Sequence, residues 1–134
     1  MSARRFAAHL IVAALAAGCA VAGSAAARPA TSNPPCFFVS QWQGWKSPSP
    51  DVIYLGVNMH DVYRVDLSAG SSQLQWPSAH LVSIVRGGDS ICSPLDLQLS
   101  VADTNGFATP LIARSLTKLT PEEVAAIPKK DRPN

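Results

Sequence analysis

The sequence predicts a small all-β domain over residues 36–128, an antiparallel sandwich or barrel of about six strands with a short C-terminal helix. Apolar and polar residues alternate over residues 62–67 and 95–101, which is typical of strands with one buried face. Turn-forming residues recur about every 8–12 positions, and a helical pattern occurs only near the C-terminus. These observations indicate an antiparallel fold rather than a helical or α/β one.

Residues 1–27 have the layout of a bacterial signal peptide. Arg4 and Arg5 form a basic start, residues 6–21 are largely apolar, and small residues follow them. The apolar stretch is too short and too rich in alanine to favour a membrane-spanning helix. Residues 28–35 then contain three prolines, which predicts an extended tether before the folded domain.

Two cleavage chemistries fit this leader. Residues 25–27, directly before Arg28, form an ordinary cleavage site that would release a periplasmic domain. Residues 15–19 alternatively resemble a lipobox, in which Cys19 would be acylated and become the new N-terminus. Each lipid methylene buried in a membrane would contribute about 0.8 kcal/mol to anchoring. Leu15 lies one position too early for an ordinary lipobox, and the sequence leaves both alternatives open.

The mature part of the chain is about neutral. The whole sequence has 11 Lys and Arg against 9 Asp and Glu, but Arg4 and Arg5 belong to the leader. Without them the positive and negative charges balance, so the clustered positive charge typical of nucleic-acid or anionic-membrane binding is missing. We therefore expect no nucleic-acid partner, and membrane association only through a lipid anchor at Cys19.

The domain opens with a predicted strand and a hairpin. Residues 36–45 combine aromatic and β-favouring residues, which indicates the first strand. A Ser-Pro-Ser-Pro-Asp turn at 47–51 separates it from residues 52–57. Residues 52–57 and 62–67 each place apolar side chains on one face, so they predict an antiparallel hairpin around a turn at 58–61.

The second half of the domain predicts more strands. They are expected at residues 74–76, 80–86, 91–92, 95–101 and 107–119. Pro77 limits the first of them, and Asn105-Gly106 predicts a type I′ hairpin turn because both residues tolerate positive φ. Pro110 should confine part of the last strand to a sheet edge or a bulge.

The C-terminal segment begins with a capping box. Thr120 is the predicted N-cap, Pro121 the first helical residue, and Glu123 the side chain that reaches back. Pro128 should end the helix after about two turns. Residues 129–134 are expected to form a charged, frayed tail.

Three cysteines suggest one processing residue and one pair. Cys19 lies in the leader, whereas Cys36 and Cys92 lie in the mature part. A bridge between the latter two would close a loop of about 57 residues and stabilise the fold by roughly 4 kcal/mol on the chain-entropy model. Two buried free thiols are the alternative. The sequence has no CxxC and no Cys/His cluster, so no metal or cofactor site is predicted.

The order Cys-Phe, Trp, Tyr, Gly-Gly, Ile-Cys resembles a family of small exported bacterial proteins that is classed as a domain of unknown function and includes many lipoproteins. The matching residues are Cys36, Phe37, Trp45, Tyr63, Gly87, Gly88, Ile91, Cys92 and residues 119–124. The resemblance implies a fold and an exported location but no activity. Members often carry a second cysteine pair, where this chain has Ser71 and Ser72 in one region and Ala108 or Ala113 in the other. Both cysteines of that second pair are absent from this chain, as expected if they are bonded to each other in other members. Their joint absence supports pairing of the two cysteines that remain.

Four aromatic residues are candidates for a surface that stacks on sugar rings or peptides: Trp42, Trp45, Tyr63 and Trp76. Trp42 and Trp45 are three positions apart, so on a regular strand they point to opposite faces. They would share a face only if Gly44 marks a bulge. Packing in the core is the default role for all four, and a stacking surface is the alternative.

No catalytic residue is predicted. His60 and Asp61 are adjacent but lie in a predicted turn, where both are ordinary residues, and no Gly-x-Ser-x-Gly motif occurs. His80 begins a predicted strand, and no spacing argument joins it to His60 as a metal pair. We therefore expect a non-enzymatic envelope domain that binds an envelope protein or a cell-wall component. The alternative is a small periplasmic hydrolase or enzyme inhibitor.

Overall fold

A computed structural model describes residues 36–84 and 88–133. The predicted signal peptide (residues 1–27), its candidate acylation site Cys19 and the tether at 28–35 lie outside the described residues. So does the end of the strand that was predicted at 80–86.

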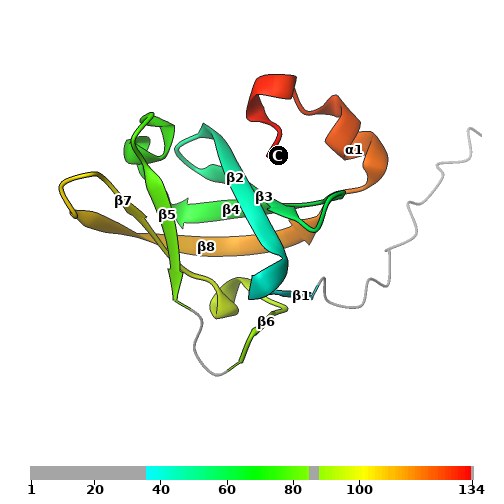
Figure 1. The fold of residues 1–134 in the computed structure, drawn as a ribbon, viewed down its shortest axis with the longest axis horizontal. Helices are drawn as coiled ribbons and strands as arrows, with labels where there is room; N and C mark the ends of the chain where they lie inside the picture. The colour runs from blue at the N-terminus through cyan, green and yellow to red at the C-terminus, as the bar shows by residue number, and fades with distance from the viewer. Residues whose placement is uncertain (1–35, 85–87, 134) are drawn as a thin grey trace, which may run out of the picture. The chain divides into compact units, whose positions relative to one another are not determined.

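Six antiparallel strands form one curled sheet, a half-barrel, in the order β2-β3-β4-β8-β7-β5 (Figure 1). Their bounds are Trp42–Ser49 for β2, Val52–Val57 for β3, Asp61–Ala69 for β4, His80–Ile84 for β5, Gln98–Ala102 for β7 and Ala108–Lys118 for β8. A second, two-stranded sheet pairs β1 (Phe37–Phe38) with β6 (Ser90–Ile91). The predicted all-β class with one short C-terminal helix is confirmed.

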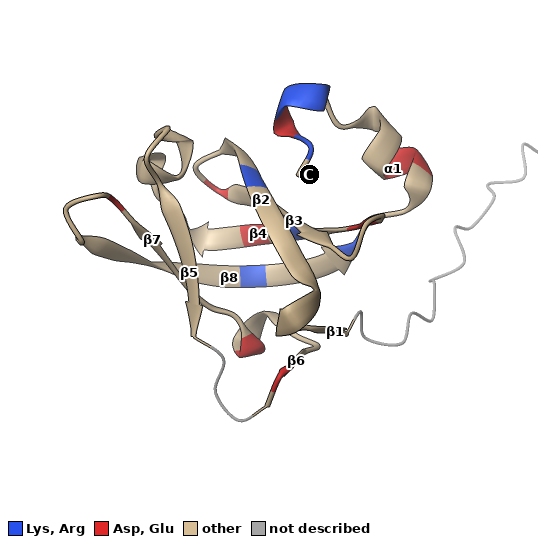
Figure 2. Cartoon of the chain, in the orientation of Figure 1, with Lys and Arg blue, Asp and Glu red and all other residues tan. Residues whose placement is uncertain are grey.

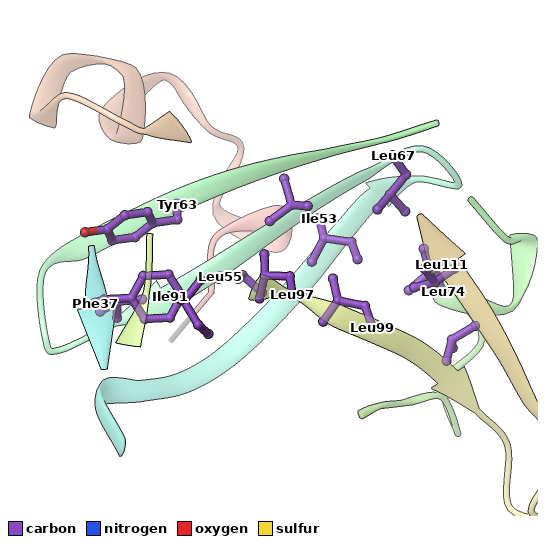
Figure 3. Close-up of a cluster of buried hydrophobic side chains, with 13 residues drawn as sticks. Phe37, Ile53, Leu55, Tyr63, Leu67, Leu74, Ile91, Leu97, Leu99 and Leu111 are labelled. Carbon is purple, nitrogen blue, oxygen red and sulfur yellow. The ribbon is translucent and has the colours of Figure 1, made fainter. Parts of the chain in front are cut away.

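The core lies inside the curl of the sheet (Figure 3). Its buried side chains include Ile53, Leu55 and Val57 of β3, on the face that alternation predicted. Tyr63 of β4 packs against Phe37 of β1, with 4.7 Å between the ring centroids. The small sheet therefore contributes to the same core as the large one.

3-10 turns interrupt, replace or shorten three of the predicted strands, so these predictions were wrong in detail. Turn η1 (Val39–Gln41) divides the strand predicted at 36–45, η2 (Ser72–Gln75) replaces the one at 74–76, and η3 (Pro94–Asp96) delays β7 to Gln98. Leu95 is consequently 88% exposed instead of lying on a strand face.

A side-chain acceptor beside each turn explains the difference. The Gln41 amide oxygen accepts a hydrogen bond from Phe38 N at 2.8 Å, and the Ser71 hydroxyl accepts one from Gln73 N at 3.2 Å. The Asp96 carboxylate accepts from Cys92 N at 3.0 Å and Ser93 N at 2.9 Å. Such local bonds offer the backbone an alternative to strand pairing.

Two prolines lie within strands of the large sheet, at Pro48 and Pro110. Strand β2 continues through Pro48, inside the predicted 47–51 turn, because an edge strand tolerates a residue without an N–H donor. Pro110 lies in a part of β8 that pairs with β7 before pairing with β4 begins at Ile112, as expected for a partial edge.

The turn between β7 and β8 is not type I′. Gly106 has a φ of +83°, whereas Asn105 is not among the described residues with positive φ. Asp103 organises this turn instead: its carboxylate accepts from Asn105 N at 2.9 Å and Phe107 N at 3.2 Å. An aspartate that bonds its own following backbone stabilises such a turn without a second left-handed residue.

Helix α1 (Pro121–Ala126) begins at the predicted capping box. Glu123 N donates to Thr120 Oγ1 at 3.3 Å, and Thr120 N donates to a Glu123 carboxylate oxygen at 2.7 Å. The helix ends before Pro128, as predicted.

The frayed tail, in contrast, was a wrong prediction for residues 129–133. Turn η4 (Lys129–Asp131) follows α1, and Arg132 Nη2 donates to the carbonyls of Ala125 at 3.1 Å and Ile127 at 3.0 Å. Ile127 is buried, and so is Pro133, which anchors the end of the described chain.

The predicted disulfide joins Cys36 to Cys92, so the alternative of two free thiols was wrong. A disulfide is compatible with an oxidising, exported environment. Among the described residues, no helix has the length and apolar character needed to cross a membrane.

Candidate functional site

A cleft of about 540 Å³ lies along the edge strand β2, beside the end of η2 and turn η4. It brings together two of the four candidate aromatics, Trp45 and Trp76. The remaining lining residues are Lys46, Ser47, Pro48, Leu74, Gln75, Pro77, Ala79, Lys130 and Asp131. This volume falls within the range of about 300–1,000 Å³ that is usual for small-molecule sites.

A β-bulge sets the direction of Trp45. Trp42 lies opposite Val57 and Gly44 lies opposite Gly56, so Gln43 is an extra residue in β2. The extra residue resets the alternation, and Trp42 and Trp45 both pack against the core. The expectation of opposite faces was therefore wrong, and the alternative of a bulge beside Gly44 was right.

Turn η2 presents Trp76 from the other side of the cleft. Leu74 is buried in the core, and Gln75 Nε2 donates to the carbonyl of Pro48 on β2 at 3.2 Å. The Gln73 side chain accepts from Thr109 Oγ1 of β8 at 2.6 Å. Trp76 follows directly and is 50% exposed, so one indole stands at the rim of the cleft on a firmly held turn.

Gly70 lets η2 approach the β2–β3 hairpin. The backbone N–H of Ser71 donates to the carbonyl of Pro50 at 3.1 Å. A Cβ atom on Gly70 would lie 1.9 Å from that same oxygen, closer than any side chain can approach. Glycine at this position therefore positions η2, and with it Trp76.

Charged side chains complete the cleft. Lys46 comes from β2, whereas Lys130 and Asp131 come from η4, and Figure 2 shows basic positions on both elements. Within residues 36–84 and 88–133 the ion pairs are Arg64–Asp66 and Lys118–Asp61. Neither cleft lysine is therefore neutralised by an ion pair in that part of the chain, and the lining carries one net positive charge.

Tyr63 and Trp42 do not join this aromatic surface. Tyr63 is only 2% exposed, and burial raises the pKa of its hydroxyl, with Lys118 opposing and Asp61 adding to the effect. Its inclusion among the stacking candidates was wrong, because Tyr63 lies in the core. Trp42 is half-buried, and its Nε1–H donates to the carbonyl of Gly44 at 2.9 Å, which holds it at the bulge.

The two histidines lie outside the cleft. His60 is exposed in the β3–β4 turn, and its neighbour Asp61 forms an ion pair with Lys118 at 2.8 Å. Lys118 donates a hydrogen bond to the Asp61 carboxylate, and this bond raises the pKa of Lys118. The Asp61 carboxylate is therefore bonded to Lys118 and not to His60. His80 is exposed at the start of β5, opposite Ala102. The part of the chain that the structure describes contains no group of three His, Cys, Asp or Glu placed to hold a metal.

Sequence reasoning missed the polar half of the cleft. Lys130 and Asp131 belong to the segment that was expected to fray, and Gln75 to a predicted strand. One local signal was available, because Trp45 and Trp76 are each followed by proline within three positions. Proline stiffens the backbone beside an aromatic side chain, which suits a preorganised binding surface.

No protein-family model matches this chain, and no curated protein or solved structure does. The geometry and chemistry of the cleft are therefore the basis for assigning a function.

Proposed function

We propose that this chain is an exported, non-enzymatic binding domain of the cell envelope that holds sugar rings of a cell-wall glycan in its cleft. The layout of the leader supports export, to the periplasm or to a lipid-anchored position, and the Cys36–Cys92 bond is compatible with it. The proposed relationship to exported proteins of unknown function agrees with this location.

The meeting of Trp45 and Trp76 in one cleft is the observation that carries the proposal. Indole rings bury a large flat area at a low cost in side-chain entropy, which suits the apolar faces of sugars. Ser47, Gln75 and Asp131 supply hydroxyl, amide and carboxylate groups along the same cleft for sugar hydroxyls. Most of the cleft lining is polar, so hydrogen bonds to sugar hydroxyls would orient a ligand while the two indoles contact its ring.

The geometry favours binding over hydrolysis. A hydrolase needs a nucleophile within hydrogen-bond reach of a base, or two positioned carboxylates for glycosidic bonds. Asp131 is the one carboxylate that lines the cleft in the described residues, and neither His60 nor His80 does. We therefore assign the cleft a binding role.

The test is calorimetric titration of the full chain with a soluble tetramer of N-acetylglucosamine. We expect saturable binding, and a loss of affinity of roughly tenfold for Trp76→Ala, because a stacked ring is worth about 1.5 kcal/mol. Trp76 is half exposed, so this variant should lose some stability yet remain folded, and its unfolding temperature shows that the titration is made on folded protein.

Phe107→Ala is the matched control. Phe107 is also an exposed aromatic residue, at 73%, but it does not line the cleft, so its loss should leave affinity unchanged. Absence of glycan binding by the wild-type chain, or equal losses for Trp76→Ala and Phe107→Ala, would contradict the proposal.

A further inference from the structure

Two lysines that are far apart in the sequence line the cleft together with the tryptophans. Lys46 follows Trp45 on β2, and Lys130 lies on η4, which packs against β2. In the described part of the chain, the cationic groups held in ion pairs are Arg64 and Lys118, both outside the cleft. The lining of the cleft therefore includes two lysines that no ion pair in the described residues neutralises, in a mature chain that is about neutral overall.

The fold holds both lysines in place by its backbone. Lys46 lies opposite Tyr54 in the β2–β3 ladder. The η4 turn is held by Asp131 N, which donates to the carbonyl of Pro128 at 2.9 Å, and by the two bonds from Arg132 to the end of α1. Both lysines thus line the same cleft from elements whose backbones are anchored.

We infer that the glycan bound in this cleft is anionic, with a carboxylate on a sugar ring that Lys46 and Lys130 bind while Trp45 and Trp76 contact the ring. This inference rests on the proposed function, which by itself concerns glycans of any charge. Asp131 would repel a carboxylate, but two lysines outnumber it, and its oxygens can accept hydrogen bonds from sugar hydroxyls. Hydrogen bonds between ammonium and carboxylate are about twice as strong as neutral ones.

Two tetrasaccharides that differ in carboxylates test the inference. One is the neutral N-acetylglucosamine tetramer, and the other alternates N-acetylglucosamine with N-acetylmuramic acid, which adds a lactyl carboxylate to every second ring. At low ionic strength the full chain should bind the acidic tetramer roughly five- to tenfold more tightly, a gain typical of one or two exposed charge contacts. The advantage should shrink as salt is raised, because exposed charges are screened. Tetragalacturonate, in a third titration, shows whether a uronic carboxylate serves as well as a muramyl one.

Substitution of single lysines locates the contact. Lys46→Gln and Lys130→Gln should each reduce affinity for the acidic tetramer roughly threefold or more and leave affinity for the neutral one unchanged. Lys129→Gln is the control, because it removes the same charge from the same turn but does not line the cleft.

The outcomes separate the two proposals. Equal affinity for acidic and neutral tetramers, or equal losses for Lys129→Gln and Lys130→Gln, would overturn the anionic preference and leave the binding function standing. Failure of both tetramers to bind would overturn the proposed function, and the preference with it.

Discussion

Cys36 and Cys92 extend the β1–β6 ladder by one position beyond the Phe37–Ile91 pair, with 4.1 Å between their Cα atoms. Cys36 is the residue before β1, and Cys92 is the residue after β6. Phe37 and Ile91 are both buried in the core. The disulfide therefore secures a two-stranded sheet that is too short to be stable alone but contributes two core side chains.

Cys36→Ser and Cys92→Ser should each lower the free energy of unfolding by roughly 2–4 kcal/mol, because the bond restricts the unfolded chain. The double variant should be no less stable than either single one, since the second change removes nothing further from a broken pair. Urea unfolding of the oxidised protein measures all three. Additive losses in the double variant would show that the two thiols act independently.

Gly70→Ala should destabilise the fold by about 1–3 kcal/mol, because the new methyl group would overlap the Pro50 carbonyl and push η2 away from the β2–β3 hairpin. If the cleft binds glycans as proposed, the same displacement of Trp76 should weaken that binding. Gly88→Ala is the control: its Cβ would have no atom within 4 Å, and its stability should change by less than about 0.5 kcal/mol. Thermal unfolding of both variants gives the comparison, and similar values for the two would refute the steric argument.

Asp66 links β4 to β8 on the outer face of the sheet. Ser115 Oγ donates to one of its carboxylate oxygens at 2.7 Å, and Arg64 Nε donates to the other at 2.8 Å. Burial by itself raises the pKa of Asp66, but these hydrogen bonds and the charges of Arg64 and Arg114 hold the pKa below its usual value. The ionised carboxylate is therefore favoured in the folded state.

Asp66→Asn should lower stability by about 1 kcal/mol at pH 7, the usual value of such a bond. A lowered folded-state pKa means that this stabilisation is present above the unfolded value of about 3.9 and is lost as the pH falls through the folded one. Urea unfolding at neutral pH and at about pH 2–3 should show the wild type and variant converging in acid. Asp89→Asn, at an exposed position, serves as the control. A stability difference that stays constant with pH would contradict this account.

The lipobox alternative predicts that Cys19→Ser abolishes lipid labelling and moves the protein from the membrane to the soluble fraction. Metabolic labelling with a fatty acid, followed by fractionation, measures both effects. A wild-type protein that carries no label and begins at Arg28 would instead establish ordinary cleavage after residues 25–27.

The sequence alone determined the features that depend on neighbouring residues. Strict alternation predicted β3 and β4, because a strand with one buried face repeats every two residues. The Thr120 cap could also be predicted, because its hydrogen bonds join residues only three positions apart in the sequence. The cysteine count predicted which thiols pair, because the third cysteine, Cys19, lies in the predicted signal peptide.

Only the tertiary structure decided what depends on segments distant in the chain. The pairing of β2 with β3 shows the bulge at Gln43, and this bulge places Trp42 and Trp45 on one face. Lys130 reached the cleft because the Arg132 bonds fold the C-terminal segment back onto the domain. No local sequence pattern predicts such contacts, because they stabilise the protein only when β2, η2 and η4 are packed together. Strands β3 and β4 were therefore predictable from their own residues, whereas the cleft exists only in the assembled fold.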